Sequence, residues 1–206
     1  ILCHYLCSKC TTRNQLPSCS KRCKWRCTDT TATNYNAQAN VDDGSCAYSI
    51  AIGLTYQGGI IFWLDGNGGG LIAAPSDQTG GAEWGCYGTN ISGANETAIG
   101  TGFYNTIDIE VGCSMPDIAA DICWNLTLNG YSDWFLPSKD ELNEMYLNIG
   151  QGNALGLGNI GGFANSNYWS STEFDSNSAW WQYFDGGDHD DGDKYYSANV
   201  RPVRAF

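Results

Sequence analysis

Residues 167–206, which close the chain, read NYWSSTEFDSNSAWWQYFDGGDHDDGDKYYSANVRPVRAF. Both ends of this stretch are typical of β-structure, with an aromatic opening at 168–172 and a terminal strand predicted over 198–206. The residues between them show no helical period and are rich in Asp, Gly, Ser and aromatic side chains. Aromatic residues supply contact area at low entropy cost, and small polar residues adapt their hydrogen bonds. We interpret this stretch as a contact surface that the rest of the chain presents.

The region before this surface predicts the elements of an α+β domain that spans residues 48–206. The apolar run 60–64, a glycine-rich turn and the apolar run 71–74 predict a β-hairpin. Residues 75–115 show little periodicity and are expected to form a long loop, for which Cys86 and Cys113 are the natural disulfide pair.

Two helices are predicted after this loop. Residues 117–126 form a plausible short helix that ends near a glycine. Ser138 and Glu141 have the spacing of a capping box, which marks the start of a second helix. Its apolar side chains fall at helical spacing, which directs one face to the core: Leu142, Met145, Tyr146 and Ile149.

Charge and cysteine content indicate an exported protein. Six of the ten Lys and Arg residues lie in 1–27, which contains no Asp or Glu, so residues 28–206 carry four basic and 22 acidic side chains. A surface this acidic repels phosphate, which argues against a nucleic-acid partner. Ten cysteines favour an oxidising compartment, and no apolar run approaches the ~18 residues of a membrane span. We expect an extracellular or cell-surface bacterial protein, or one on a virion surface.

The first 26 residues form a basic, cysteine-rich segment with no extended periodic pattern. Its cysteines fit a disulfide-stapled segment better than a zinc site, because zinc fingers usually show two separated ligand pairs at tighter spacing. A poorly ordered leader is the third alternative. Seven cysteines lie in 3–46 and three lie later, so either one bridge joins the two regions or free thiols remain.

Residues 27–47 form a second small unit, in which 27–46 read CTDTTATNYNAQANVDDGSC. The stretch resembles a short module common in exported bacterial proteins. The resemblance implies a disulfide between Cys27 and Cys46 around a tight loop whose turn is made by Asp42, Asp43 and Gly44. The Asp and Asn oxygens of this unit are alternative ligands for calcium, but their spacing is not that of an EF-hand, and we favour turn chemistry.

Three motifs of the main domain, taken together, resemble a known family. Residues 130–142 read GYSDWFLPSKDEL, residues 168–173 read YWSSTE and residues 200–204 read VRPVR. They are similar to the Legionella collagen-like protein C-terminal domain family, also known as DUF1566, over about 55–206. The resemblance implies a C-type-lectin-like fold with two helices, a small antiparallel sheet that joins the ends of the domain, and long loops that carry the ligand surface.

The closing stretch also resembles the variable region of a diversity-generating retroelement target protein. In those systems a reverse transcriptase randomises template adenines, so that asparagine codons yield many residue types. The resemblance implies a non-enzymatic receptor whose diversified surface binds another protein or a cell-surface ligand. The predicted contact residues are Phe174, Asp175, Ser178, Trp181, Tyr183, Asp185, Asp188, His189, Asp190, Asp191, Asp193, Tyr195 and Tyr196.

A surface that tolerates randomisation needs side chains that point away from the scaffold. If 180–185 is a strand, Trp180 and Phe184 share one face while Trp181 and Tyr183 share the other. We predict that Trp180 and Phe184 belong to the core and that Trp181 and Tyr183 are exposed binding anchors. The alternative is that all of these aromatic residues are core.

Two other functions compete with this prediction. The Asp- and Gly-rich run 185–193 has the composition of a calcium loop, which would suit a calcium-dependent or polysaccharide-binding adhesin. Sugar-binding signatures of C-type lectins are absent, so we predict no cofactor and keep calcium as the alternative. An enzyme related to formylglycine-generating proteins is disfavoured, because His4 and His189 are the only histidines and neither accompanies a nucleophile motif. The sequence sets no oligomeric state.

Overall fold

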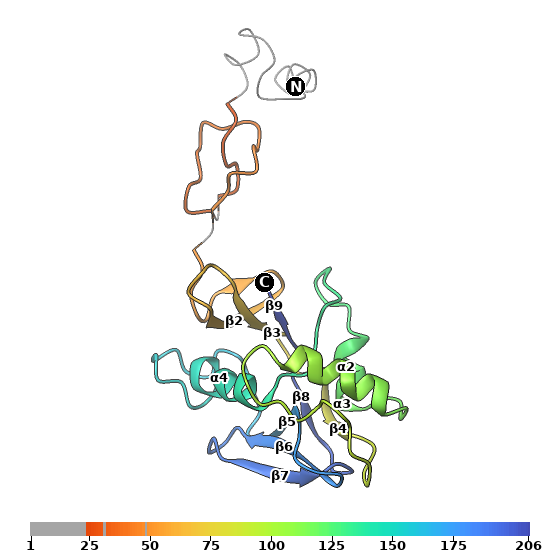
Figure 1. Cartoon of the computed structure of the whole chain (residues 1–206). Helices are drawn as coiled ribbons and strands as arrows, with labels where there is room; N and C mark the ends of the chain where they lie inside the picture. Colours follow the sequence, from red (N-terminus) through yellow and green to blue (C-terminus); the bar gives the residue numbers. More distant parts are fainter. Residues whose placement is uncertain (1–23, 31, 48) are drawn as a thin grey trace. The chain divides into compact units, whose positions relative to one another are not determined.

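The computed structural model describes residues 24–30, 32–47 and 49–206 (Figure 1). The chain divides into two compact units, residues 1–50 and 51–206. The cysteines at 3–23, with their disulfide and zinc alternatives, lie outside the described residues.

In the first unit, the disulfide between Cys27 and Cys46 is confirmed. The predicted turn is confirmed as well: Asp42 Oδ1 accepts a hydrogen bond from the Gly44 amide at 2.9 Å, and Asp43 Oδ1 accepts one from the Ser45 amide at 3.1 Å. Gly44 has φ +74°, a backbone conformation that residues with a Cβ rarely adopt. These aspartates therefore shape the turn.

The second unit contains a four-stranded antiparallel sheet in the order β1-β2-β3-β9. Its strands are β1 (Thr55–Tyr56), β2 (Gly59–Leu64), β3 (Gly70–Ala73) and β9 (Val203–Ala205). The predicted hairpin is confirmed as β2 and β3. Because β9 ends the chain and pairs with β3, this sheet joins the two ends of the domain (Figure 1).

A five-stranded sheet in the order β4-β8-β5-β6-β7 carries most of residues 167–206. Its strands are β4 (Thr79–Ala82), β5 (Asn167–Glu173), β6 (Ser178–Tyr183), β7 (His189–Asp193) and β8 (Ala198–Val200). All neighbours are antiparallel except β5 and β8, which are parallel. The prediction of one terminal strand over 198–206 is wrong, because Arg201 and Pro202 interrupt it and β8 and β9 enter different sheets. Proline has no N–H to continue a strand ladder.

The described residues form three helices, α2 (Gly102–Gly112), α3 (Ala119–Trp124) and α4 (Lys139–Ile149). The two predicted helices are confirmed, and α4 begins with the predicted capping box. The expectations of two helices and of a loop throughout 75–115 are wrong, because α2 was missed. Its buried face carries Asn105 and Thr106, whose side chains donate to the carbonyls of Glu96 and Gly102 at 2.7 Å each. Polar residues on the buried face hide the apolar period that predicts a helix.

Buried side chains form two clusters, one on each face of the five-stranded sheet. Neighbouring residues of β5 separate between them: Trp169 packs with residues of α2 and α3, whereas Tyr168 packs with α4 and the four-stranded sheet. Successive strand side chains point to opposite faces, so β5 is covered on both. Among the described residues, no helix is long and apolar enough to cross a membrane.

Candidate ligand-binding surface

The predicted contact residues gather on the β6–β7 hairpin and on the turns beside it, at the edge of the five-stranded sheet (Figure 1). In this hairpin Ser178 pairs with Asp193, Trp181 with Asp190 and Gln182 with His189. The turns lie side by side because the Lys194 amide donates to the Asn177 carbonyl at 2.8 Å. Among the described strands, none pairs with the outer side of β7, so the hairpin forms the edge of the sheet.

Three exposed tyrosines form a cluster that we call the tyrosine face: Tyr87, Tyr195 and Tyr196, exposed by 51%, 47% and 46%. Tyr195 contacts both of the others edge to face, with ring centroids 5.0 Å from Tyr87 and 4.7 Å from Tyr196. Hydrogen bonds to Tyr196 and Asp193 raise the pKa of the Tyr195 phenol. Such rings combine an apolar body with a polar tip, which suits binding anchors. Sequence reasoning missed Tyr87, which lies outside the closing stretch.

Trp181 supports the tyrosine face from below, and the prediction that it is exposed is wrong. The side chain is only 8% exposed and lies between Trp169, at a centroid distance of 4.9 Å, and Tyr196, at 6.1 Å. A Cβ on Gly192 would approach the Trp181 ring to 2.7 Å, so the ring lies directly over the glycine. Trp169 and Trp181 are direct partners in the β5–β6 ladder, and this pairing directs Trp181 into the core.

The predictions of which other aromatic side chains of 180–185 are buried were partly correct. Phe184 is fully buried, as predicted, and packs against Tyr168 and Phe163. Trp180, predicted to be core, is only half-buried: the Lys139 ammonium lies 3.2 Å from its ring centroid. Tyr183, predicted to be exposed, is half-buried beside Trp181. The predicted alternation of side chains along β6 is therefore correct, but neither face of this strand is fully exposed to solvent.

The thirteen predicted contact residues therefore differ in accessibility. Ser178 and Trp181 are buried, and Tyr183, His189 and Asp193 are half-buried. The remaining eight are exposed: Phe174, Asp175, Asp185, Asp188, Asp190, Asp191, Tyr195 and Tyr196.

Two polar atoms of the hairpin are buried without a hydrogen-bond partner on the side that faces α4, Gln182 Oε1 and His189 Nε2. The Gln182 amide group donates instead to Asn143 Oδ1 at 3.0 Å and to the Gly187 carbonyl at 3.1 Å. Burial, and then the nearby Lys139 ammonium, lower the pKa of His189, which favours the neutral imidazole.

The aspartates of the hairpin are spread along its strands and turns. Among the residues that the structure describes, no group of three or more His, Cys, Asp or Glu side chains is arranged to hold a metal ion. Asp175 has a local role, since its Oδ1 accepts from the amides of Asn177 and Ser178 at 2.7 and 2.8 Å. These backbone hydrogen bonds lower the pKa of the Asp175 carboxyl.

All four basic side chains of residues 51–206, a range described throughout, are engaged elsewhere in the fold. Lys194 is buried and bonds Glu173 at 2.5 Å, while Arg201 bonds Asp77 and Arg204 bonds Asp133, each at 2.6 Å. The fourth, Lys139, lies over the Trp180 ring. No ion pair therefore joins a basic side chain of this unit to the exposed aspartates of the hairpin.

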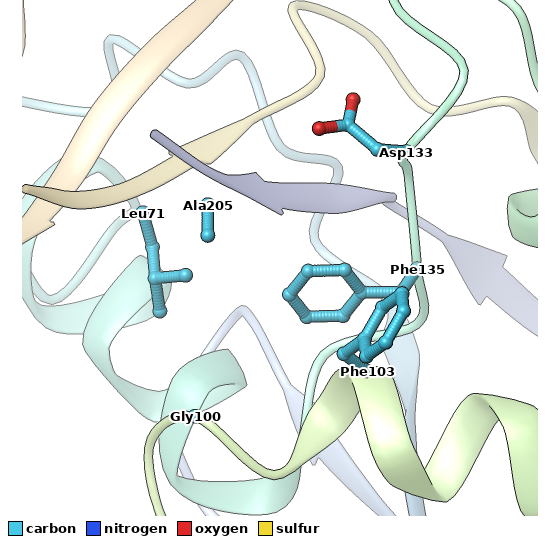
Figure 2. Close-up of a pocket in the computed structure, with 6 residues that line it drawn as sticks. All are labelled: Leu71, Gly100, Phe103, Asp133, Phe135 and Ala205. Atoms are coloured by element: carbon cyan, nitrogen blue, oxygen red, sulfur yellow. The ribbon is translucent and has the colours of Figure 1, made fainter.

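A separate pocket of about 360 Å³ lies by β3 and β9 (Figure 2). It is lined by Leu71, Gly100, Phe103, Asp133, Phe135 and Ala205. Its phenyl rings meet edge to face, with centroids 5.8 Å apart, and the Asp133 carboxylate points away from them (Figure 2). Both oxygens of this carboxylate accept from Arg204, at 2.6 and 2.7 Å, which lowers the pKa of Asp133. The pocket is thus largely apolar, and sequence reasoning predicted none of it.

The disulfide between Cys86 and Cys113 is confirmed and holds the loop that carries Tyr87. Cys123 is a buried free cysteine on α3, so the expectation that unpaired cysteines would leave a free thiol holds for this residue. Burial raises the pKa of the Cys123 thiol, which keeps it protonated and unreactive.

Comparison with protein families identifies the domain that carries this surface. The family model described as the Lcl C-terminal domain matches residues 76–204, which include the β6–β7 hairpin and the loop with Tyr87. A search among curated proteins found no match.

Proposed function

Because the chain belongs to the Lcl C-terminal domain family, we propose that it is a non-enzymatic receptor with a C-type-lectin-like fold, whose edge hairpin carries a retroelement-diversified binding surface. The family suggests a protein-interaction domain at the cell surface or outside the cell, and two disulfides fit that location. The sheet that joins both ends of the domain supports the C-type-lectin-like fold.

The observation that carries the proposal is the separation between the exposed residues of 174–196 and the layer beneath them. The eight exposed contact residues stand on the edge hairpin and the turns beside it, whereas Trp169, Trp181 and Phe184 beneath them are buried. Side chains in water contribute little to folding, so their identity is free to change.

The residue types agree with this division. All eight exposed contact residues are Phe, Asp or Tyr, and each of these is reached from an asparagine codon by changing its two adenines. Tryptophan is not reached this way, because its codon ends in guanine. Trp180 and Trp181 are the hairpin's tryptophans, and neither is exposed. This supports diversification of the surface over a constant supporting layer.

The test replaces all eight exposed residues with asparagine, the residue that an unaltered template would encode. We expect cooperative unfolding to persist with a change in Tm below about 15 °C, because surface substitutions usually change stability by less than about 0.5 kcal/mol each, about 4 kcal/mol at most for all eight, and about 1 kcal/mol shifts the Tm of such a domain by about 2–4 °C. The matched control adds Trp181→Asn to this variant and should unfold. If the variant with only the eight asparagine substitutions, without Trp181→Asn, no longer unfolds cooperatively, the proposal is refuted.

Diversification has its own test. The gene is sequenced from many cells of one population, and we expect substitutions concentrated in the codons for 174–196. An invariant gene across such populations would remove the retroelement from the proposal and leave an undiversified receptor.

A second candidate function is that of a polysaccharide-binding adhesin. The observation in its favour is the exposed tyrosine face, since aromatic rings and neighbouring carboxylates also bind neutral sugars. Titration with neutral oligosaccharides, with and without calcium, distinguishes it from a protein receptor.

A further inference from the structure

We infer that the tyrosine face and the aspartates beside it bind a basic segment of a partner protein, in which Lys and Arg side chains stack on the tyrosine rings and pair with the carboxylates. The inference rests on the proposed function and names the chemistry of the partner.

The tyrosine face is organised before binding. Tyr87 follows a disulfide-bonded cysteine, and the next amide, that of Gly88, donates to the Ser176 carbonyl at 2.8 Å. The carbonyl of the following residue, Thr89, accepts a hydrogen bond from the buried Lys194 ammonium at 2.8 Å. The loop that carries Tyr87 is therefore hydrogen-bonded to the turn before β6 and to the residue that follows β7. A pre-organised surface loses less entropy on binding.

Carboxylates border the rings of the tyrosine face. Asp190 is exposed and lies opposite Trp181 in the β6–β7 ladder, so it shares the face of the hairpin on which Tyr196 stacks. Asp193 forms a hydrogen bond with Tyr195. A cation seated on these rings therefore finds negative charge within the same cluster.

The domain's own basic side chains leave the charge of these aspartates unbalanced. The four basic side chains of 51–206 are committed to Glu173, Asp77, Asp133 and the Trp180 ring. Adjacent exposed aspartates repel one another, and a basic partner relieves that repulsion.

The fold already uses the contact that we infer for the partner. The Lys139 ammonium lies 3.2 Å from the Trp180 ring centroid, and the Arg204 guanidinium lies 4.0 Å from that of Tyr131. A cation over an aromatic face is attracted by the ring quadrupole, and a carboxylate beside the ring adds to the attraction. The tyrosine face offers the same geometry to a cation from outside.

Other ligands fit this surface less well. Nucleic acids and sulfated polysaccharides are repelled by the aspartates. Calcium is usually held by converging carboxylates, and the described residues hold no group of three or more His, Cys, Asp or Glu side chains that could bind a metal ion. A segment with spaced Lys and Arg side chains satisfies both the rings and the carboxylates.

The test uses the full chain as bait for a displayed library of random twelve-residue peptides. Recovered peptides are screened again on a variant with Tyr87→Ser, Tyr195→Ser and Tyr196→Ser. The control is Tyr104→Ser, a tyrosine of α2 that is 66% exposed and does not belong to the tyrosine face. Thermal unfolding of each variant verifies that it is folded.

We expect peptides that bind the wild type and the control but bind the triple variant at least about 30-fold more weakly. They should be enriched in Lys and Arg. Asp190→Asn should weaken them at least about threefold, and raising NaCl from about 50 to about 500 mM at least about fivefold.

The outcomes separate the inference from the proposed function. Peptides that depend on the three tyrosines but show no excess of Lys and Arg would overturn the inference and leave the receptor proposal intact. If no recovered peptide depends on these tyrosines, both fail. If Tyr87→Ser alone leaves binding unchanged, the loop before α2 is not part of the surface and the inference is overturned in its present form.

Discussion

The two neighbouring tryptophans of β6 give a sharp test of the structure, because strand alternation alone assigned them the opposite roles. Trp181→Ala removes a side chain that is only 8% exposed and packs against Trp169 and Tyr196. Trp180→Ala removes a half-buried side chain whose partners are Lys139 and Phe174. The two variants carry the same substitution, Trp to Ala, at neighbouring positions of one strand.

The magnitude follows from burial. An aromatic side chain buries about 150–250 Å², which at about 25 cal/mol per Å² stabilises the fold by about 4–6 kcal/mol when burial is nearly complete. Trp181 Nε1 is buried without a hydrogen-bond partner, which offsets about 1 kcal/mol or more of that gain. We therefore expect Trp181→Ala to destabilise the domain by about 3–5 kcal/mol, within the usual range for such core truncations. Trp180→Ala should cost roughly half as much.

Urea unfolding with the disulfides intact measures both variants, with tryptophan fluorescence and circular dichroism as independent probes. The midpoints convert to free energies of unfolding if the m-value stays constant. A loss below about 1 kcal/mol for Trp181→Ala, or a larger loss for Trp180→Ala than for Trp181→Ala, would refute the assignment of Trp181 to the supporting layer.

Three further outcomes are expected. Gly192→Ala should destabilise the domain by about 1–3 kcal/mol in the same urea assay, because the new methyl group meets the Trp181 ring at 2.7 Å; an unchanged midpoint would contradict this packing. Cys123 should resist alkylation in the folded protein at pH 8 and react after unfolding, as measured by mass spectrometry of its peptide, because burial raises the pKa of the thiol; rapid labelling of the native chain would contradict its burial. Asp133 is ionised more readily in the folded state because the hydrogen bonds from the Arg204 guanidinium lower its pKa. The contribution of the Asp133 carboxylate to the free energy of unfolding is therefore fully present above the unfolded pKa of an aspartate, and it is lost as pH falls through the lower folded pKa. Asp133→Asn should thus reduce the loss of stability on acidification below about pH 4, and thermal unfolding at a series of pH values measures it; an identical pH profile would count against the ion pair.

The parts of the fold that were predictable from sequence are those fixed by local chemistry. The β2–β3 hairpin follows from two apolar runs around a glycine-rich turn, and α4 follows from its capping box and apolar period. Helix α2 was not predictable in this way, because its buried face uses Asn105 and Thr106 to satisfy backbone carbonyls. A buried helix face made of polar residues can be identified only when the segments that carry the bonded carbonyls are known.

The binding surface illustrates a second limit. Alternation along β6 correctly placed Trp180 and Trp181 on opposite faces, but period 2 does not say which face meets solvent. The answer depends on β5, α2, α3 and α4, which cover both faces of the hairpin's inner strand to different extents. Tyr87 is a stronger case, because no sequence pattern connects it with Tyr195. The Cys86–Cys113 disulfide and the hydrogen bonds of Gly88 to Ser176 and of Thr89 to Lys194 bring the two rings together.

This arrangement is what the proposed variable surface requires of a stable fold within one short segment. The side chains that change least freely are those with two partners inside the domain, such as Trp181 between Trp169 and Tyr196. Those free to change stand on backbone that is held by the β6–β7 ladder, whereas the exposed Asp175 carboxylate itself holds its turn by accepting two backbone hydrogen bonds. Tyr87 adds an anchor from a loop that the closing stretch does not encode. If the surface is diversified, every variant inherits that anchor, so variants should share a preference for one partner chemistry while differing in affinity.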